Sequence, residues 1–159
     1  MKTLRGCNRV RRLTVYLIDT NVISEARKGR SANGGVRAFF KSCGTTAELV
    51  YLSVITIGEL RRGVELIRHR GDLSQALLLE AWLATILEEY SSHVLDFGAD
   101  AAQVWGRLRV PHAENAIDKQ IAAIALVNNL TVVTRNVDDF ALTGVNILNP
   151  FFGGETSEL

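Results

Sequence analysis

Four acidic residues, Asp19, Glu59, Asp118 and Asp139, stand where their carboxylates could share one site. Carboxylates that converge within a few ångströms repel one another, so that one of them holds a proton or all of them share a cation. Oxygen-only ligands suit Mg²⁺ or Mn²⁺. A divalent ion held in this way activates water and neutralises a phosphate, which makes hydrolysis of a phosphodiester bond the natural chemistry of such a site.

The clearest strand signal lies directly before Asp19. Val15–Ile18 is a short apolar run bounded by polar residues, as is typical of a buried strand. Thr20 or Asn21 is a natural first residue for the helix that follows. We therefore expect Asp19 at the carboxyl edge of a central strand, where open α/β sheets bind their ligands.

Two more of the acids follow predicted strands. Glu59 comes after the strand predicted over residues 49–52, and Asp139 comes after the strand predicted over residues 131–134. In a parallel sheet these carboxyl ends meet at one edge. Asp118 differs because its helix follows a loop, so it must reach this edge from the side.

Helical patterns alternate with the predicted strands along the chain. This alternation predicts an α/β fold with a parallel sheet and helices on both faces. Residues 73–90 carry a surplus of apolar side chains, which suggests that this helix covers a groove taken by a partner segment or a second subunit. The predicted helices cover residues 21–27, 35–42, 53–67, 73–90, 99–109 and 117–127, and two further short strands cover residues 94–95 and 145–148.

The composition indicates one globular domain. The chain has 159 residues, of which 47% are hydrophobic and only 2 are Pro, and its net charge is +1. No run approaches the roughly 18 apolar residues of a membrane span. Cys7 and Cys43 match no metal or redox spacing. We therefore expect a cytoplasmic protein with no membrane partner.

The chain begins with a basic segment that shows no helical or strand period. We expect residues 1–14 to lie outside the fold, as a disordered basic extension or as the product of an upstream start codon. The competing interpretation is a basic arm that binds RNA or DNA. The domain itself is expected over residues 15–152, followed by a short tail at residues 153–159. Five cations and no acid precede Val15, namely Lys2, Arg5, Arg9, Arg11 and Arg12.

Each acid taken alone also has a local explanation. Thr56, Asn115 and Asn136 each precede an acid by three residues, the spacing of a helix capping box, which is worth about 1 kcal/mol. Asp19 could cap the helix predicted from Asn21. Considered together, the acids favour a shared site, because three of them follow strands at one edge of the sheet.

Five motifs in order resemble the PIN-domain family of the VapC toxin type, and their order and spacing match the family from residue 15 to residue 151. The resemblance implies a three-layer α/β/α PIN-like fold with a central, mostly parallel sheet. It also implies a Mg²⁺- or Mn²⁺-dependent ribonuclease, which forms a homodimer and is held inactive by a small cognate antitoxin in a toxin–antitoxin hetero-oligomer. The motifs are LIDTNVISE at 17–25, SVITIGEL at 53–60, IDKQIAA at 117–123, TRNVDDF at 134–140 and NP at 149–150.

By position, the resemblance implies that Asp19, Glu59 and Asp118 are catalytic residues that bind metal. The fourth place is open between Asp139 and Asn136, because some family members have an acid where Asn136 stands. An Asn is a neutral and weaker ligand, so either Asp139 supplies the charge or the site works with three acids. Residues with a substrate-binding or positioning role are expected to be Asn21, Thr134, Arg135 and Asn136.

We therefore predict an endoribonuclease toxin of a type II toxin–antitoxin pair with an RNA substrate. Two alternatives stay open. A catalytically weak PIN-like domain would bind an antitoxin or RNA without cleaving it, and the departure at Asn136 keeps this possible. An aspartyl phosphoryl-transfer enzyme would use Asp19 as its nucleophile. That enzyme would want a second acid two residues on, where this chain has Asn21.

Overall fold

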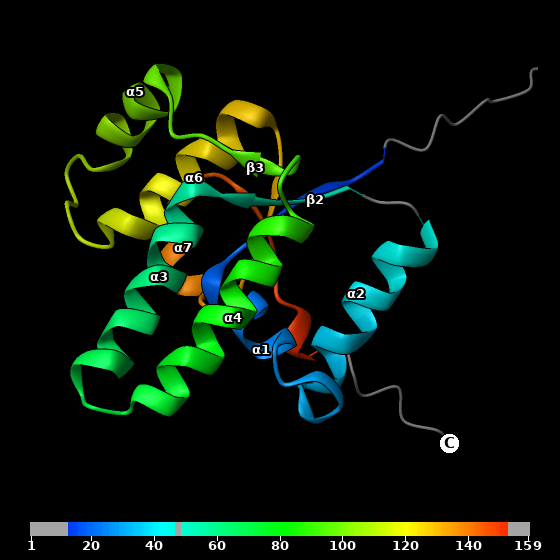
Figure 1. Ribbon diagram of the computed structural model, residues 1–159. Coiled ribbons are helices and arrows are strands. Elements are labelled where there is room, and N and C mark those ends of the chain that lie inside the picture. Colours follow the sequence, from blue (N-terminus) through cyan, green and yellow to red (C-terminus); the bar gives the residue numbers. More distant parts are fainter. Residues whose placement is uncertain (1–12, 47–48, 153–159) are drawn as a thin grey trace, which may run out of the picture.

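A sheet of five parallel strands forms the middle layer of the protein (Figure 1). The computed structural model describes residues 13–46 and 49–152, and the expectations for residues 1–12 and 153–159 lie outside the described residues. All strand predictions are confirmed to within a residue at each end. The strands are β1 (Val15–Ile18), β2 (Leu49–Ser53), β3 (Val94–Leu95), β4 (Thr131–Val133) and β5 (Asn146–Leu148).

Helices connect these strands, and the predicted helices are found with two differences. The second runs four residues beyond its predicted end at Ser42, because the hydroxyls of Thr45 and Thr46 both donate to the Ser42 carbonyl and support a further turn. The four-residue α7 was too short to give a helical period. The helices are α1 (Thr20–Ala26), α2 (Gly34–Thr46), α3 (Val54–His69), α4 (Leu73–Glu89), α5 (Ala99–Leu108), α6 (Ala116–Asn128) and α7 (Val137–Phe140), with 3₁₀ turns at Gly29–Ser31 and Pro150–Phe152.

The sheet is covered on both faces, which confirms the predicted α/β/α layering (Figure 1). Successive strand residues point to opposite faces. Leu17 and Val132 pack on one face with residues of α5, α6 and α7. Ile18 and Val133 pack on the other face with residues of α1 to α4. Because both faces are buried, the strands are continuous apolar runs without polar alternation.

The strand order creates a crevice beside the first strand. The order β3-β2-β1-β4-β5 places β2 and β3 on one side of β1, and β4 and β5 on the other. Open α/β sheets bind ligands where the order reverses, at the carboxyl ends of the strands. Ile18 pairs with Val133 in the register of β1 and β4, so Asp19 and Thr134 leave the sheet side by side at this point.

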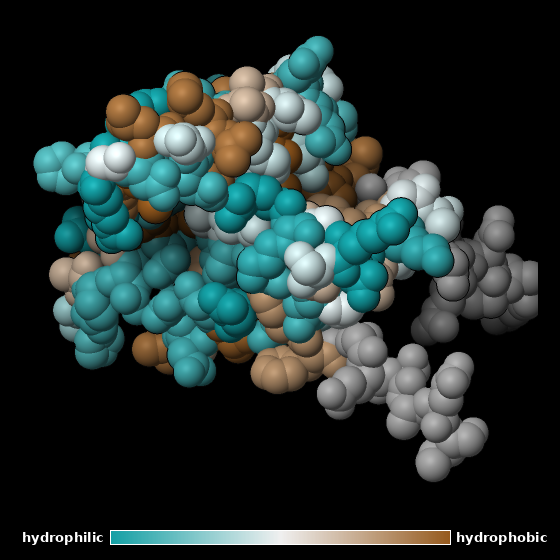
Figure 2. Space-filling model, turned by 60° about the horizontal axis from the view of Figure 1, so that its bottom comes forward, coloured by the Kyte–Doolittle hydropathy of each residue, from teal (hydrophilic) through white to brown (hydrophobic). Residues whose placement is uncertain are grey.

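The face of the molecule shown in Figure 2 is largely polar. Hydrophilic side chains cover most of the face in Figure 2, and the hydrophobic side chains on it gather mainly near its upper edge. Leu73, Leu77 and Leu78 of α4 are exposed, in keeping with the surplus of apolar residues noted in this segment. Within the described ranges, no helix is both long enough and apolar enough to cross a membrane.

Phe140 should anchor α7, and with it Asp139, to the core. Its side chain is 0% exposed, so Phe140→Ala should lower the free energy of unfolding by about 3–5 kcal/mol in urea denaturation. Phe152, which is 85% exposed, provides the control, and Phe152→Ala should change the value by less than about 0.5 kcal/mol. Similar losses in both variants would contradict the anchoring role of Phe140.

Candidate active site

Asp19 lies at the crevice beside the central strand. Its backbone N–H donates to the Val133 carbonyl at 2.9 Å, which extends the pairing of β1 with β4 by one residue. Its side chain then caps α1, because the backbone N–H of Thr20 donates to Asp19 Oδ1 at 2.7 Å. The residue is 3% exposed. The local capping role and the predicted place at the sheet edge are therefore found together.

A hydrogen-bond network holds the Asp19 carboxylate from the side of β4. Thr134 Oγ1 donates to Asp19 Oδ2 at 2.7 Å, and Asn21 Nδ2 donates to the same oxygen at 3.1 Å. The backbone N–H of Asn136 donates to Thr134 Oγ1 at 2.9 Å. That of Arg135 donates to Asn21 Oδ1 at 3.0 Å. The start of α1 is thus tied to the segment that follows β4.

Burial and hydrogen bonding oppose each other at Asp19. Burial raises the pKa of its carboxyl, because the charged form loses hydration. Hydrogen bonds from Thr134, Thr20 and Asn21 lower this pKa in part, and the charge of Asp139 raises it further. The net pKa of Asp19 is raised, which means that its ionised form is less favourable in the folded protein than in water.

Glu59 and Asp118 meet Asp19 at a single cavity of about 250 Å³. Glu59 is on α3, which follows β2, and Asp118 is in the first turn of α6. Neither side chain has a hydrogen-bond partner among the residues that the structure describes. The cavity is lined by Asp19, Thr20, Asn21, Glu59, Ile117, Asp118, Ile121 and Asn136.

The acids interact electrostatically across this cavity. The pKa of Asp118 is raised to about 6, first by burial and then by the charges of Asp19, Asp139 and Glu59, in that order. The three other acids singled out in the sequence therefore all act on Asp118. A carboxyl whose pKa is shifted by burial and by several like charges in a cleft is a candidate for function.

Asp139 lies beside the cavity, whereas Asn136 lines it. Asp139 belongs to a second cavity of about 280 Å³ between α7 and the loop before α6. Its Oδ1 accepts a hydrogen bond from Asn115 Nδ2 at 3.2 Å. The sequence indicated only a capping role for Asn115, and no sequence signal pointed to this contact.

The capping-box interpretations of the other acids are wrong. Ser53 caps α3, since its Oγ accepts from the Thr56 N–H, and Glu59 lies beyond the first turn of that helix. Asn115 and Asn136 do precede their helices, but neither side chain makes a capping hydrogen bond. The Asn115 amide donates instead to Asp139, which lies outside its own helix.

The donor set suits an oxygen-preferring divalent ion. Three carboxylates and two amides line one cavity, and Mg²⁺ and Mn²⁺ favour such oxygen ligands. A bound cation would also offset the burial and the like charges that raise the pKa of Asp118. Among residues 13–46 and 49–152, no three His, Cys, Asp or Glu side chains stand close enough together to hold a metal ion as they are. The side chains of Asp19, Glu59 and Asp118 would therefore have to rotate toward a cation in order to bind it together.

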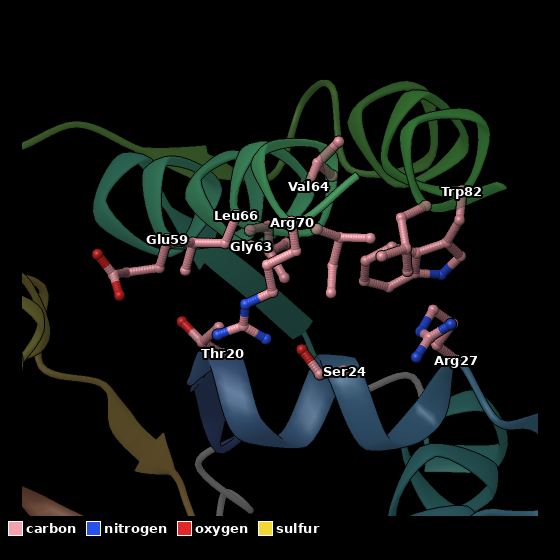
Figure 3. A pocket seen from close by; sticks show the side chains of 12 residues that line it. Thr20, Ser24, Arg27, Glu59, Gly63, Val64, Leu66, Arg70 and Trp82 are labelled. Carbon is pink, nitrogen blue, oxygen red and sulfur yellow. The ribbon is translucent and has the colours of Figure 1, made fainter. Parts of the chain in front are cut away.

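An apolar groove of about 330 Å³ leads away from the acids between α1, α3 and α4. Figure 3 shows Glu59 and Thr20 at one end of this α1–α3–α4 groove, and Trp82 with Arg27 at the other. The Arg27 guanidinium lies over the Trp82 ring, 5.8 Å from its centroid. Apolar side chains, including Val64, line its middle.

The chain is similar to known proteins over most of its length. The family model of the PIN domain matches residues 16–145. Toxin FitB of Neisseria gonorrhoeae is 35% identical over 142 residues, which cover 86% of this chain and 99% of that protein. The VapC ribonuclease Y4jK of Sinorhizobium fredii is 29% identical over 142 residues, which cover 86% of this chain and 98% of that protein.

A solved structure shares the fold. The crystal structure of FitAcB from Neisseria gonorrhoeae superposes with a TM-score of 0.73 at 33% sequence identity. The match covers 87% of this chain and 99% of that chain. The similarity therefore extends over almost all of the sheet and the helices described above.

Asp118 should make stability depend on pH. Its pKa is raised from 3.8 to about 6 in the folded protein, so the folded state binds this proton more tightly than the unfolded chain. Stability is then lost as the pH rises through this interval. Asp118→Asn should raise the free energy of unfolding of the metal-free protein more at about pH 7.5 than at about pH 4.5. Urea denaturation at both pH values measures this, and an equal gain at both would contradict the assignment.

Proposed function

The chain belongs to the PIN domain family, and on this basis we propose that it is a divalent-metal-dependent endoribonuclease and the toxin of a toxin–antitoxin pair. The observation that carries this proposal is the cavity lined by Asp19, Glu59 and Asp118 at the carboxyl edge of the sheet. Two relatives support it by name, one as a toxin and one as a ribonuclease.

Asp19, Glu59 and Asp118 would hold one or two Mg²⁺ or Mn²⁺ ions. When bound, such an ion supplies an activated water for in-line attack and neutralises the charge that develops on the phosphate. Asp19 is already oriented for this role, because Thr134 and Asn21 donate to its Oδ2. Donors of this kind fix the ligand and maintain its charge.

Asp118 would couple metal binding to pH. In the metal-free protein its pKa is about 6, so in mildly acidic solution it holds a proton that a cation must displace. Metal binding should therefore strengthen as the pH rises through this value.

Asn136 and Asp139 would share the fourth position of the metal site. Asn136 lines the cavity and offers a neutral amide oxygen. Asp139 lies next to the cavity, and its charge raises the pKa of both Asp19 and Asp118. In this arrangement Asp139 supplies negative charge that favours a cation, while Asn136 reaches the cavity itself.

An antitoxin segment would occupy the α1–α3–α4 groove, which begins at Glu59 and ends at Trp82 (Figure 3). The apolar lining suits a partner helix or extended segment. A segment seated there would lie against Glu59 and close one side of the acid cavity. Binding and inhibition would then be a single event, within a hetero-oligomer built on a homodimer.

The nuclease proposal is tested with the full chain and a mixed RNA pool. Cleavage should require Mn²⁺ or Mg²⁺ and stop with EDTA. Asp19→Asn should lower the rate more than about 100-fold, because loss of a partner to a metal ligand alone costs 10–100-fold. Asp100→Asn, at an exposed acid of α5, should retain the activity. Cleavage that survives EDTA or Asp19→Asn would contradict the mechanism, and metal binding without cleavage would favour the binding-only alternative.

Arg135 should contact the RNA backbone. It is exposed at the carboxyl edge of β4, and its guanidinium stacks on the Phe151 ring, 5.0 Å from the centroid. Arg135→Ala should weaken RNA binding and reduce the salt dependence of the affinity by about one unit of slope. Filter binding at several salt concentrations measures both. Arg107→Ala, at an exposed cation of α5, is the control, and equal effects in the two variants would contradict the contact.

A further inference from the structure

Asn115 has a left-handed backbone conformation, and its side chain forms a hydrogen bond outside its own helix. It precedes α6 in the left-handed conformation, with φ 55° and ψ 41°. Asn is one of the few residues other than Gly that adopt this conformation readily. Its side chain makes no capping bond, and Nδ2 donates instead to Asp139 Oδ1 at 3.2 Å.

The backbone around Asn115 is fixed from two sides. The Lys119 backbone N–H donates to the Asn115 carbonyl at 2.9 Å, and Lys119 Nζ donates to the His112 carbonyl in the preceding loop. Lys119 is only 7% exposed, so its ammonium ties this loop to α6 from within. On the other side, Trp105 Nε1 donates to the Ala116 carbonyl at 3.0 Å.

The Asp139 side chain is engaged by a single residue of the described chain. The Asn115 amide is its one side-chain hydrogen-bond partner among the residues that the structure describes, and it engages Oδ1. The short α7 that carries Asp139 lies between two cavities, with Asn136 at the first and Asp139 at the second. A rotation of the Asp139 side chain would therefore change how its charge acts on the acid cavity.

We infer that Asn115 is a positioning residue for Asp139, which it holds beside the acid cavity through the bond from Nδ2 to Oδ1. This inference rests on the proposed function, because the charge of Asp139 has a purpose only if the cavity binds a cation. A neutral amide is suited to the role, since it orients the carboxylate and leaves its charge intact.

The chain contains a matched control for this residue. Asn129 stands at the other end of α6, also in the left-handed conformation, with φ 54° and ψ 49°. Its side chain has no hydrogen-bond partner within the described part of the chain. Gly adopts left-handed backbone freely, so Asn115→Gly and Asn129→Gly each remove one amide side chain without backbone strain.

The experiment titrates the metal-free full-length protein with Mn²⁺ by calorimetry. Asn115→Gly should weaken the affinity on the order of 10-fold, whereas Asn129→Gly should stay within about twofold of the wild type. In an Asp139→Asn background, Asn115→Gly should add less than about twofold, because the partner through which it acts is already changed. Thermal melting of all variants verifies that they are folded.

The outcomes separate the two proposals. Equal Mn²⁺ affinities for Asn115→Gly and Asn129→Gly, or an undiminished loss in the Asp139→Asn background, would overturn the role of Asn115 and leave the nuclease proposal standing. A wild-type protein that binds no Mn²⁺ would overturn the proposed function and this inference with it. Loss at Asn115 alone, and only when Asp139 is present, would establish the positioning role.

Discussion

The burial of one carboxylate, that of Asp19, is the constraint on which the rest of the structure depends. An ionised carboxylate taken out of water costs several kcal/mol unless hydrogen bonds replace its hydration. At Asp19 these bonds come from Thr20, Asn21 and Thr134, on two different elements. The end of β1, the start of α1 and the end of β4 must therefore keep their register. The strand order places β4 beside β1 and so brings Thr134 within hydrogen-bond distance of the Asp19 carboxylate.

The acids around Asp19 work against the stability of the fold. Burial and the like charges of Asp19, Asp139 and Glu59 raise the pKa of Asp118 to about 6. A raised carboxyl pKa means that the ionised group is less favourable in the folded state than in the unfolded chain. An apolar residue in place of Asp118 would remove this penalty. A cluster of carboxylates that lowers stability and lies at the ligand-binding edge of the sheet is best explained by a bound cation, which would stabilise their ionised forms.

The sequence predicts the strands and the acids that follow them, because burial on both faces leaves a continuous apolar run that ends where the polar edge begins. It does not predict with which residues the polar side chains form hydrogen bonds. Thr134 and Asp19 are 115 positions apart and still form a bond of 2.7 Å. The capping box at Asn115 fails for the same reason, since its amide donates to Asp139 and to no group of its own helix. Local spacing indicates which bonds are available, and tertiary contacts decide which are made.

The start of α6 links the two cavities beside the sheet. Asp118 and Lys119 are adjacent in sequence, and neighbouring positions on a helix point in directions roughly 100° apart. Asp118 consequently lines the acid cavity, and Lys119 lines the second cavity and ties down the loop before the helix. That loop presents Asn115 to Asp139. The first turn of α6 therefore positions Asp118 within the cavity, and through Asn115 it contacts Asp139 beside the cavity. The placement of this buried helix therefore bears on Asp118 directly and on Asp139 through the bond from Asn115.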